Sequence, residues 1–379
     1  MSDAAPEKVA VEVVKTAPIA GQKAGTSGLR KKVAEVQSTE HYLQNWLASL
    51  FDGATDVKGK TLVVGGDGRY YNDVAVQVIV KMAAAYGAAK LVVGANGILS
   101  TPAVSAIIRA LGAHGGLILT ASHNPGGADG DFGIKYNTAN GGPAPAAITD
   151  AIYARTQTID SYRCCTALPA IDLAAVGTTR RFAVAPDDAP FAVEVISSFA
   201  HYVPLLRSMF DFDALRALLA RPDFTFRFDA LHGVAGPYAR HVFVELLGAR
   251  ADAVHNCEPK PDFGGGHPDP NLTYAVDLVK AMRAKQFDFG AASDGDADRN
   301  MVLGKDFFVN PSDSVAVIAA HAAHIPYYAK LAAVARSMPT SAALDRVATK
   351  LGLPFYEVPT GWKYFTAAMD HYAGTAVGA

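Results

Sequence analysis

The chain is poor in cysteine, and its few cysteines form no pattern of structural use. Only Cys164, Cys165 and Cys257 occur among 379 residues, and no CxxC or CxxxC pair exists. A disulfide framework and a structural zinc site both need several suitably spaced cysteines, so neither is expected. We expect three reduced thiols, as in a cytoplasmic protein.

The sequence also lacks an excess of charge of either sign. Lys and Arg number 34 and Asp and Glu 36, which gives a formal net charge of −2. Proteins that bind nucleic acid or anionic membranes through their overall field carry a basic excess. We therefore expect no nucleic-acid partner, and any charge-based chemistry must be local.

Long apolar runs are missing as well. The N-terminal MSDAAPEKVA has no basic stretch followed by an apolar core, so it does not resemble a secretory signal. Residues 82–95 are apolar but include Gly87 and Lys90, and they fall short of the ~20 residues that a membrane helix needs. The prediction is a cytoplasmic protein without a membrane span.

What the sequence does contain is globular in character. Hydrophobic residues make up 50% and charged residues 18%, enough for several cores. Strand signals at 61–65, 91–93 and 116–120 alternate with helix signals. The first helix is expected to be capped by Asn72 or Asp73 and to end at Gly87. The second is expected to be capped by Thr101, to begin with Pro102 and to end at Gly112.

The alternation restarts twice. The second block has a strand at 224–230, a helix at 234–247 ended by Gly248, a helix at 272–285 and a strand at 287–292; the third has a helix opened by Ser312 or Asp313, a strand at 331–335 and a helix at 341–351. Residues 371–379 carry neither signal. This rhythm predicts an α/β fold of consecutive three-layer α/β/α domains with mostly parallel, mixed sheets.

One acidic loop follows the strand expected at 287–292. Asp294, Asp296 and Asp298 alternate with small residues, and in an extended segment they would share one side. Three such carboxylates repel one another unless a cation lies between them, and Mg²⁺ prefers oxygen ligands. Arg299 follows at once and could meet a phosphate. An EF-hand does not fit. Counted from Asp294 as position 1, position 6 is Arg299 where the motif needs glycine, and position 12 is Lys305 where it needs glutamate.

A second loop, TASHNPGG at 120–127, follows the strand expected at 116–120. Ligands of parallel sheets bind at such strand ends. Ser122 does not stand in the G-x-S-x-G elbow of serine hydrolases, which makes that class improbable. It could instead carry a phosphoryl group, with the following glycines leaving the backbone open to phosphate. From these residues alone, an ordinary turn with an incidental serine is an equal alternative.

Two further motifs are weaker signals by themselves. Lys135 in DFGIKYN could transfer a proton or contact phosphate, although most lone lysines are surface charges. Arg30 ends the glycine-flanked GTSGLR at 25–30, which could cradle phosphate.

Together these motifs resemble the α-D-phosphohexomutase family, and most closely its eukaryotic-type, parafusin-like phosphoglucomutases. The resemblance runs in the family's order from about Gly21 to Asp370. It rests on the strings GTSGLRKKV (25–33), LTASHNPGG (119–127), GDFGIKYNTANGGPAP (130–145), DALHGVAGPYA (229–239), DFGGGHPDPNLTYA (262–275), SDGDADRNMVLG (293–304), FVNPSDSVAVIAA (308–320), ARSMPTSAALDRVA (335–348) and VPTGWKYF (358–365).

The resemblance implies a mechanism and its parts. A phosphoserine at Ser122 would exchange its phosphoryl group with glucose 1-phosphate or glucose 6-phosphate, with glucose 1,6-bisphosphate as intermediate and primer. The implied assignments are Mg²⁺ on Ser122, Asp294, Asp296 and Asp298; proton transfer by His123 or Lys135; and substrate contacts from Arg30, Ser122, Asp298, Arg299 and Thr360. Small sugar phosphates are the implied partners, and we expect a monomer.

The sequence departs from the family pattern in two places. Ala297 stands in DGDADR where the family usually has glycine, a change that is costly only if the residue needs a positive φ. Past Asp370 the family continues with a sugar-recognition loop and a fourth domain, which residues 371–379 do not match. The expected domains are therefore 1–193 with the phosphoserine loop, 194–307 with the metal loop and a partial 308–379 with the sugar-contacting loop.

That C-terminal difference leaves two functions open. The chain could be a truncated phosphoglucomutase that keeps the phosphotransfer half of the site. Alternatively, it could be a weakly active or inactive phosphoprotein or interaction module of the same family, with uncovered apolar surface for a partner.

Overall fold

The computed structural model describes residues 6–25 and 28–376, with the side chains only up to Tyr372. Thr26 and Ser27 of the predicted phosphate-cradling loop lie outside the described residues. The chain divides into two compact units, one of residues 1–201 with 259–267 and one of residues 202–258 with 268–379. Each is described separately below. The domain boundaries predicted at 193/194 and 307/308 stay predictions.

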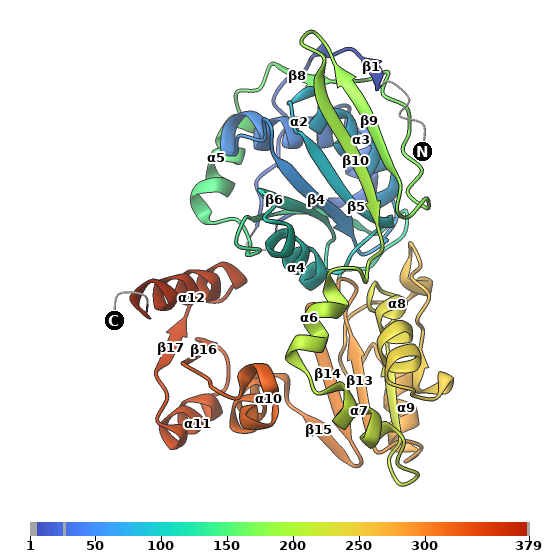
Figure 1. The fold of residues 1–379 in the computed structure, drawn as a ribbon, viewed down its shortest axis with the longest axis vertical. Coiled ribbons are helices and arrows are strands. Elements are labelled where there is room, and N and C mark those ends of the chain that lie inside the picture. Colours follow the sequence, from blue (N-terminus) through green and yellow to red (C-terminus); the bar gives the residue numbers. More distant parts are fainter. Residues whose placement is uncertain (1–5, 26–27, 377–379) are drawn as a thin grey trace. The chain divides into compact units, whose positions relative to one another are not determined.

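The first unit is built on an eight-stranded mixed sheet (Figure 1). Its strands, in spatial order, are β1 (Glu7–Val9), β9 (Thr179–Val184), β10 (Ala189–Ile196), β5 (Lys90–Ile98), β4 (Thr61–Gly66), β6 (Gly115–Leu119), β7 (Asp131–Thr138) and β3 (Leu29–Lys32). The central strands β10, β5, β4 and β6 are parallel, whereas β7 and β3 continue the sheet in antiparallel fashion. A small antiparallel pair, β2 (Glu12–Lys15) and β8 (Ser161–Cys164), lies outside this sheet.

Helices cover both faces of this sheet. They are α1 (Val33–Ser38), α2 (Tyr42–Ser49, followed by a π-helical turn at Leu50–Ala54), α3 (Asn72–Ala85), α4 (Thr101–Leu111) and α5 (Ala146–Thr156). Alternate residues of β4 point to opposite faces. Leu62 and Val64 join the core that α2 and α3 cover, and Val63 joins the core under α4. This arrangement confirms the predicted α/β/α layering.

Two predicted helix caps are wrong by one position. Helix α3 begins at Asn72, but its cap is Tyr71, held in the left-handed region at φ 76° with no side-chain cap. Helix α4 is capped by Ser100, whose hydroxyl accepts a hydrogen bond from the Ala103 N–H at 3.2 Å. The serine competes successfully with Thr101 because it alone has the extended backbone that a cap needs.

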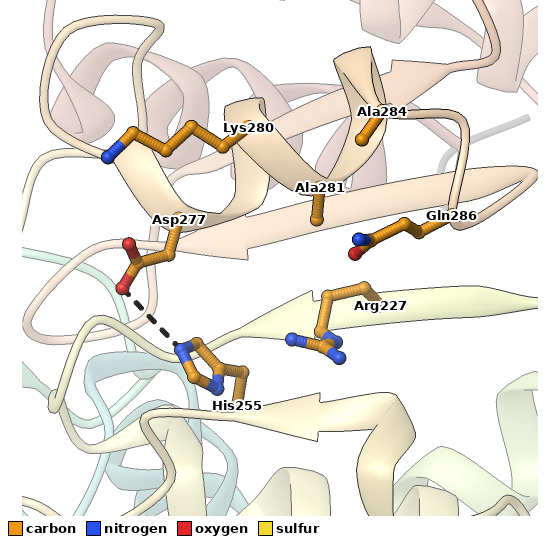
Figure 2. Close-up of a pocket in the computed structure, with 7 residues that line it drawn as sticks. All are labelled: Arg227, His255, Asp277, Lys280, Ala281, Ala284 and Gln286. Atoms are coloured by element: carbon orange, nitrogen blue, oxygen red, sulfur yellow. Dashed lines mark ion pairs between the residues drawn. The ribbon is translucent and has the colours of Figure 1, made fainter.

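The second unit contains a five-stranded sheet and a separate parallel pair. The sheet order is β12 (Val254–His255), β11 (Phe226–Asp229), β13 (Phe289–Ser293), β14 (Asn300–Gly304) and β15 (Phe307–Val309), and the pair is β16 (Val334–Ser337) with β17 (Phe355–Val358). The first three strands are parallel and the last two antiparallel. Strands β11 and β12 and helix α9 (Val276–Arg283) border a cavity (Figure 2).

The helices of this unit are α6 (Tyr202–Met209), α7 (Phe212–Leu219), α8 (Ala235–Ala239, continued by a π-helix at Arg240–Leu246), α9, α10 (Pro311–Ala320), α11 (Ala343–Leu351) and α12 (Trp362–Ala376), with short 3₁₀ turns at Ala251–Ala253, Ala322–His324 and Pro326–Tyr328. The four predicted helices correspond to α8 with its continuation, α9, α10 and α11, whereas α6 and α7 were not predicted. A further 3₁₀ turn, Phe263–Gly265, lies in the segment that belongs to the first unit. The absence of helix signal beyond residue 370 was misleading, because α12 runs on to Ala376. None of the described helices is both long and apolar enough to cross a membrane.

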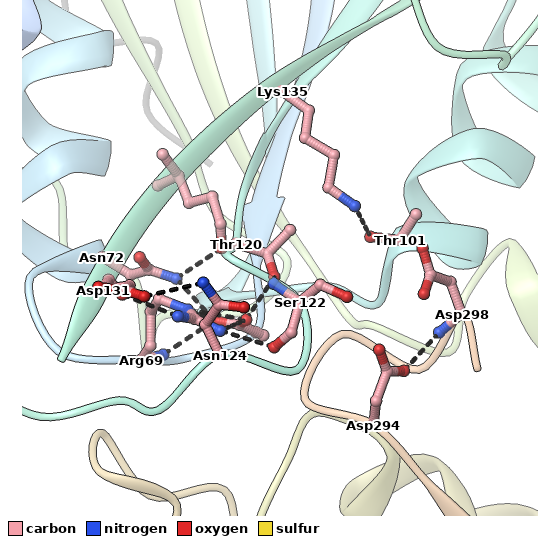
Figure 3. Close-up of polar contacts among 12 residues, drawn as sticks. Arg69, Asn72, Thr101, Thr120, Ser122, Asn124, Asp131, Lys135, Asp294 and Asp298 are labelled. Carbon is pink, nitrogen blue, oxygen red and sulfur yellow. Dashed lines mark hydrogen bonds and ion pairs between the residues drawn. The ribbon is translucent and has the colours of Figure 1, made fainter. Parts of the chain in front are cut away.

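A buried ion pair ties the central strands of the first unit to the loop that carries Ser122. The side chains of Asp67 and Arg69 are fully buried, with Arg69 Nη2 2.9 Å from Asp67 Oδ2. The same guanidinium donates to the carbonyl of Ser122 at 2.8 Å and to that of Asp131 at 2.7 Å (Figure 3). One side chain after β4 therefore holds both ends of the β6–β7 connection. Its charge is tolerable inside the protein because Asp67 neutralises it.

Removal of this arginine should destabilise the first unit strongly. Arg69→Met leaves the Asp67 carboxylate buried without its counter-ion, which costs about 3–5 kcal/mol of unfolding free energy. Urea denaturation followed by circular dichroism measures the effect. The double variant Asp67→Asn/Arg69→Met, which removes both charges, should be more stable than Arg69→Met alone. If the single variant loses less than about 1 kcal/mol, in the range of exposed pairs, the ion pair does not hold the loop.

Candidate functional site

Ser122 is held at the end of β6 in a strained and buried conformation. Its residue is 1% exposed and its φ is +57°, a left-handed backbone that costs a non-glycine residue roughly 1–2 kcal/mol. The Ser122 N–H donates to Thr120 Oγ1 at 2.7 Å, and the Thr120 hydroxyl donates to Asp67 Oδ2 at 2.5 Å. The buried ion pair thus fixes the serine through its N–H as well as its carbonyl. Such an outlier at a strand end is typical of functional sites.

Neighbouring strand β7 can approach this loop only because it carries a glycine. A Cβ at Gly133 would stand 2.1 Å from the Thr120 carbonyl oxygen. Further along the loop, Asn124 donates its amide to Asp131 Oδ2 at 2.8 Å, and Lys32 contacts the other oxygen at 2.8 Å. Burial alone would raise the pKa of Asp131, but these two partners outweigh it and lower the pKa.

The glycines after Ser122 have a packing role that the sequence reading missed. Segment 259–267, far away in the sequence, belongs to the same compact unit. The Pro261 carbonyl accepts hydrogen bonds from Gly127 N–H at 3.0 Å and Tyr70 N–H at 2.9 Å. A Cβ at Gly126 would stand 2.6 Å from the same oxygen. The glycines therefore admit this segment, and the string DFGGGH was the only signal that could have indicated it.

The other residues predicted to lie around Ser122 come from neighbouring elements of the same unit. Lys135 lies on β7, is 9% exposed and has its Nζ 3.4 Å from the Thr101 hydroxyl at the start of α4 (Figure 3). Arg30 lies on β3 opposite Gly133 and is half-buried. The ring of His123, next to Ser122, packs edge-on against His267 at 6.4 Å between centroids. The four predicted side chains thus belong to the loop after β6 and to the two strands beside it.

The acidic loop lies in the second unit, directly after β13. Asp294 and Asp296 are completely buried, and one carboxylate oxygen from each of Asp294, Asp296 and Asp298 lies within 4.8 Å of the others. The loop is a tight turn, which the small residues Gly295 and Ala297 allow, and not the extended segment in which the three aspartates would share one side. Backbone hydrogen bonds close it, among them Ala297 N–H to the Asp294 carbonyl at 3.2 Å. The turn brings the three carboxylates together nevertheless.

The electrostatics of this turn favour a bound cation. Burial first, and then the carboxylates of Asp296 and Asp298, raise the pKa of Asp294 well above its ordinary value. Asp294 Oδ1 accepts from the Asp298 N–H at 3.0 Å (Figure 3) and from the Arg299 N–H at 3.0 Å, and Arg299 Nη1 lies 3.1 Å from Oδ2. One arginine balances part of the negative charge of three carboxylates. The oxygen-only donor set fits a hard divalent ion such as Mg²⁺.

Thr360 is placed apart from this loop within the second unit. It is exposed in the turn between β17 and α12, beside Gly361 at φ +130°. The turn belongs to the two-stranded sheet, whereas the acidic loop belongs to the five-stranded one. Its assignment to sugar contact stays a prediction.

The alanine of the acidic loop is in the conformation that the sequence reading identified as costly. Ala297 has φ +63°, where a Cβ meets the following carbonyl and costs roughly 1–2 kcal/mol. Ala297→Gly should therefore raise the unfolding free energy by roughly 0.5–1 kcal/mol, after the entropy that glycine gains in the unfolded chain is subtracted. Chemical denaturation in EDTA measures it. Ala291→Gly, in extended strand β13, should destabilise; equal losses in both variants would contradict the strain.

Three family models match the chain. They are described as phosphoglucomutase/phosphomannomutase alpha/beta/alpha domain I at residues 21–163, domain II at 200–306 and domain III at 311–379. Among curated proteins, the chain is 56% identical over 372 residues to a phosphoglucomutase, cytoplasmic 2, of Zea mays, with 94% of this chain and 63% of the relative covered. It is 58% identical over 377 residues to a probable phosphoglucomutase, cytoplasmic 1, of Arabidopsis thaliana, covering 95% and 64%.

A solved structure shows the same relation. The crystal structure of the open form of the Paramecium exocytosis-sensitive phosphoprotein pp63/parafusin, a phosphoglucomutase, superposes with a TM-score of 0.92 at 47% identity, covering 96% of this chain and 67% of that one. The chain spans slightly less than two thirds of the length of the two plant relatives. From the matched domains and these identities, the chain belongs to the phosphoglucomutase/phosphomannomutase family of α-D-phosphohexomutases, on its eukaryotic phosphoglucomutase side.

Proposed function

We propose that the chain takes part in phosphoglucomutase chemistry, the interconversion of glucose 1-phosphate and glucose 6-phosphate through a phosphoserine. The observation that carries the proposal is Ser122, buried in a strained backbone and held at both its N–H and its carbonyl. A hydroxyl that alternately gives and accepts a phosphoryl group must be positioned before the reaction, because positioning supplies much of the catalysis in phosphoryl transfer. The plant relatives and the Paramecium structure are named for the same activity.

The proposed reaction divides the work among this chain's own residues. Phosphorylated Ser122 gives its phosphoryl group to a sugar hydroxyl, the bisphosphate reorients, and the serine takes back the phosphate from the other position. Lys135 or His123 moves the proton of the reacting hydroxyl. Arg30, Arg299 and Thr360 would bind the sugar phosphate.

The acidic loop would supply the metal. Asp294, Asp296 and Asp298, together with the phosphate on Ser122, would hold Mg²⁺, which neutralises phosphate charge and acts as a Lewis acid when bound. The raised pKa of Asp294 supports this assignment, since burial and then the neighbouring carboxylates raise it, and a bound cation would offset both effects. Glucose 1,6-bisphosphate would serve as primer, and we propose a monomer in the cytoplasm, by analogy with the relatives named cytoplasmic.

A second candidate function is an interaction module of the same family. Helix α12 exposes Trp362 at 62% and Met369 at 71%, and α10 exposes Val317 and Ile318 at 52% and 53%. Large apolar side chains at such exposure are usual at contact surfaces when they cluster. One activity assay distinguishes the two candidate functions, because only phosphoglucomutase chemistry requires the chain to turn over substrate.

The assay follows conversion of glucose 1-phosphate to glucose 6-phosphate, with magnesium and the bisphosphate primer. Wild-type chain should turn over, and Ser122→Ala should abolish conversion because no group remains to carry the phosphate. Asp296→Asn, or EDTA, should reduce the rate by a factor on the order of 10² or more, as loss of a metal that neutralises phosphate charge implies.

Circular dichroism and melting curves would check that both variants fold. Asp129→Asn, an exposed acidic residue of the loop between β6 and β7, serves as matched control and should leave the rate unchanged. Wild-type activity no higher than that of Ser122→Ala would overturn the proposal and favour the interaction module.

A further inference from the structure

The second unit has an open surface cavity whose residues take no part in the proposed reaction. Its volume is about 410 Å³. Strands β11 and β12 contribute two basic side chains from below, and α9 with the turn after it contributes the rest (Figure 2). The lining residues are Arg227, His255, Asp277, Lys280, Ala281, Ala284 and Gln286.

The cavity exists because α9 covers only part of one sheet face. Leu278 and Met282 of the helix pack on β13, where a Cβ at Gly290 would meet the Met282 sulfur at 2.8 Å. In register with Gly290 on the neighbouring strand is Arg227, and beyond it β12 adds His255 at the edge. Because Gly290 has no side chain, α9 packs close to β13. The part of the same sheet face that β11 and β12 form is lined by polar side chains instead.

The charges around this cavity are predominantly basic. In the part of the chain that the structure describes, Arg227 and Lys280 make no hydrogen bond or ion pair through their charged groups, and Arg227 Nε is buried. His255 Nε2 lies 3.6 Å from Asp277 Oδ2, so the one lining carboxylate faces the imidazole. The nearby Asp252 is already engaged by Arg250, with contacts of 2.8 and 3.0 Å.

Arg227 is oriented rather than free to swing into solvent. Its guanidinium lies over the ring of Phe287, 4.5 Å from the centroid. This cation–π contact uses no N–H donor as a hydrogen bond, so the donors are left for another ligand. A half-buried arginine whose donors lack a protein acceptor indicates an acceptor from outside the chain.

We propose that this cavity is a binding site for the phosphate group of a small phosphate monoester, distinct from the Ser122 and aspartate loops. A guanidinium edge binds two phosphate oxygens side by side, and Lys280, exposed on α9, adds a positive charge at the rim of the cavity. The imidazole of His255 and the amide of Gln286 supply further donors. The site depends on neither Ser122 phosphorylation nor turnover.

The test is a titration of the ¹⁵N-labelled full chain with inorganic phosphate at pH 7 and constant ionic strength. The side-chain signals of Gln286 and Arg227 Nε, assigned by their loss in Gln286→Glu and Arg227→Gln, should shift and saturate with a dissociation constant on the order of 1 mM. Arg227→Gln should weaken binding roughly tenfold, read from the Gln286 signal, because charge-assisted hydrogen bonds are lost. Lys280→Gln should weaken it, and Asp277→Asn should tighten it, each roughly threefold.

The matched control is Arg283→Gln, which removes one positive charge from the same helix outside the cavity. It should leave the affinity unchanged. Acetate at equal ionic strength should bind at least roughly tenfold more weakly than phosphate, since it offers one charge and two oxygens. Absence of a saturable shift, equal losses in Arg283→Gln and Lys280→Gln, or equal affinity for acetate would each overturn the proposal. Lys280 is exposed, so its variant keeps the test valid even if Arg227→Gln unfolds.

Discussion

The buried pair of Asp67 and Arg69 is the constraint on which the serine half of the molecule depends. Two opposite charges inside a protein are costly to desolvate, and such a pair persists where its geometry and hydrogen bonds are nearly complete. Here the arginine satisfies two carbonyls of the β6–β7 connection, and the aspartate receives the Thr120 hydroxyl that in turn holds Ser122 N–H. The left-handed backbone of Ser122 is stable only because these contacts determine it from several sides.

In the acidic turn of the second unit, the clustered charges have the same sign instead of opposite signs. Arg299 balances part of these charges. Below the serine, the buried charges of Asp67 and Arg69 balance each other, whereas the acidic turn favours a cation from outside. Within the second unit, the cavity beside β11 and β12 shows the reverse imbalance, with basic side chains that lack an acceptor. Both imbalances point to ligands, one cationic and one anionic.

The sequence predicted the layers and the two loops, since both depend on local patterns: apolar runs, glycine stops, and polar clusters after strands. It did not predict the partners of Ser122. Asp67 and Arg69 stand in a glycine-rich turn, GGDGR, and nothing local shows that this turn packs under a loop 53 residues away. For the same reason, the sequence did not predict the packing of segment 259–267 or the cation–π contact of Arg227 with Phe287. Whether Ala297 is strained depends on its φ, which the sequence does not give and which is positive in the structure.

The assignment of Ser122 as a phosphoryl carrier is tested most directly by following labelled phosphate on the chain. Mass spectrometry of peptides, after incubation with magnesium and glucose 1,6-bisphosphate that carries ¹⁸O-labelled phosphates, should find one labelled phosphoryl group on the peptide that contains Ser122. A chase with excess unlabelled glucose 1-phosphate should replace the label with unlabelled phosphate, because the carrier gives its phosphoryl group to the sugar and takes another one back. Label on another residue, or label retained on Ser122 through the chase, would contradict the assignment.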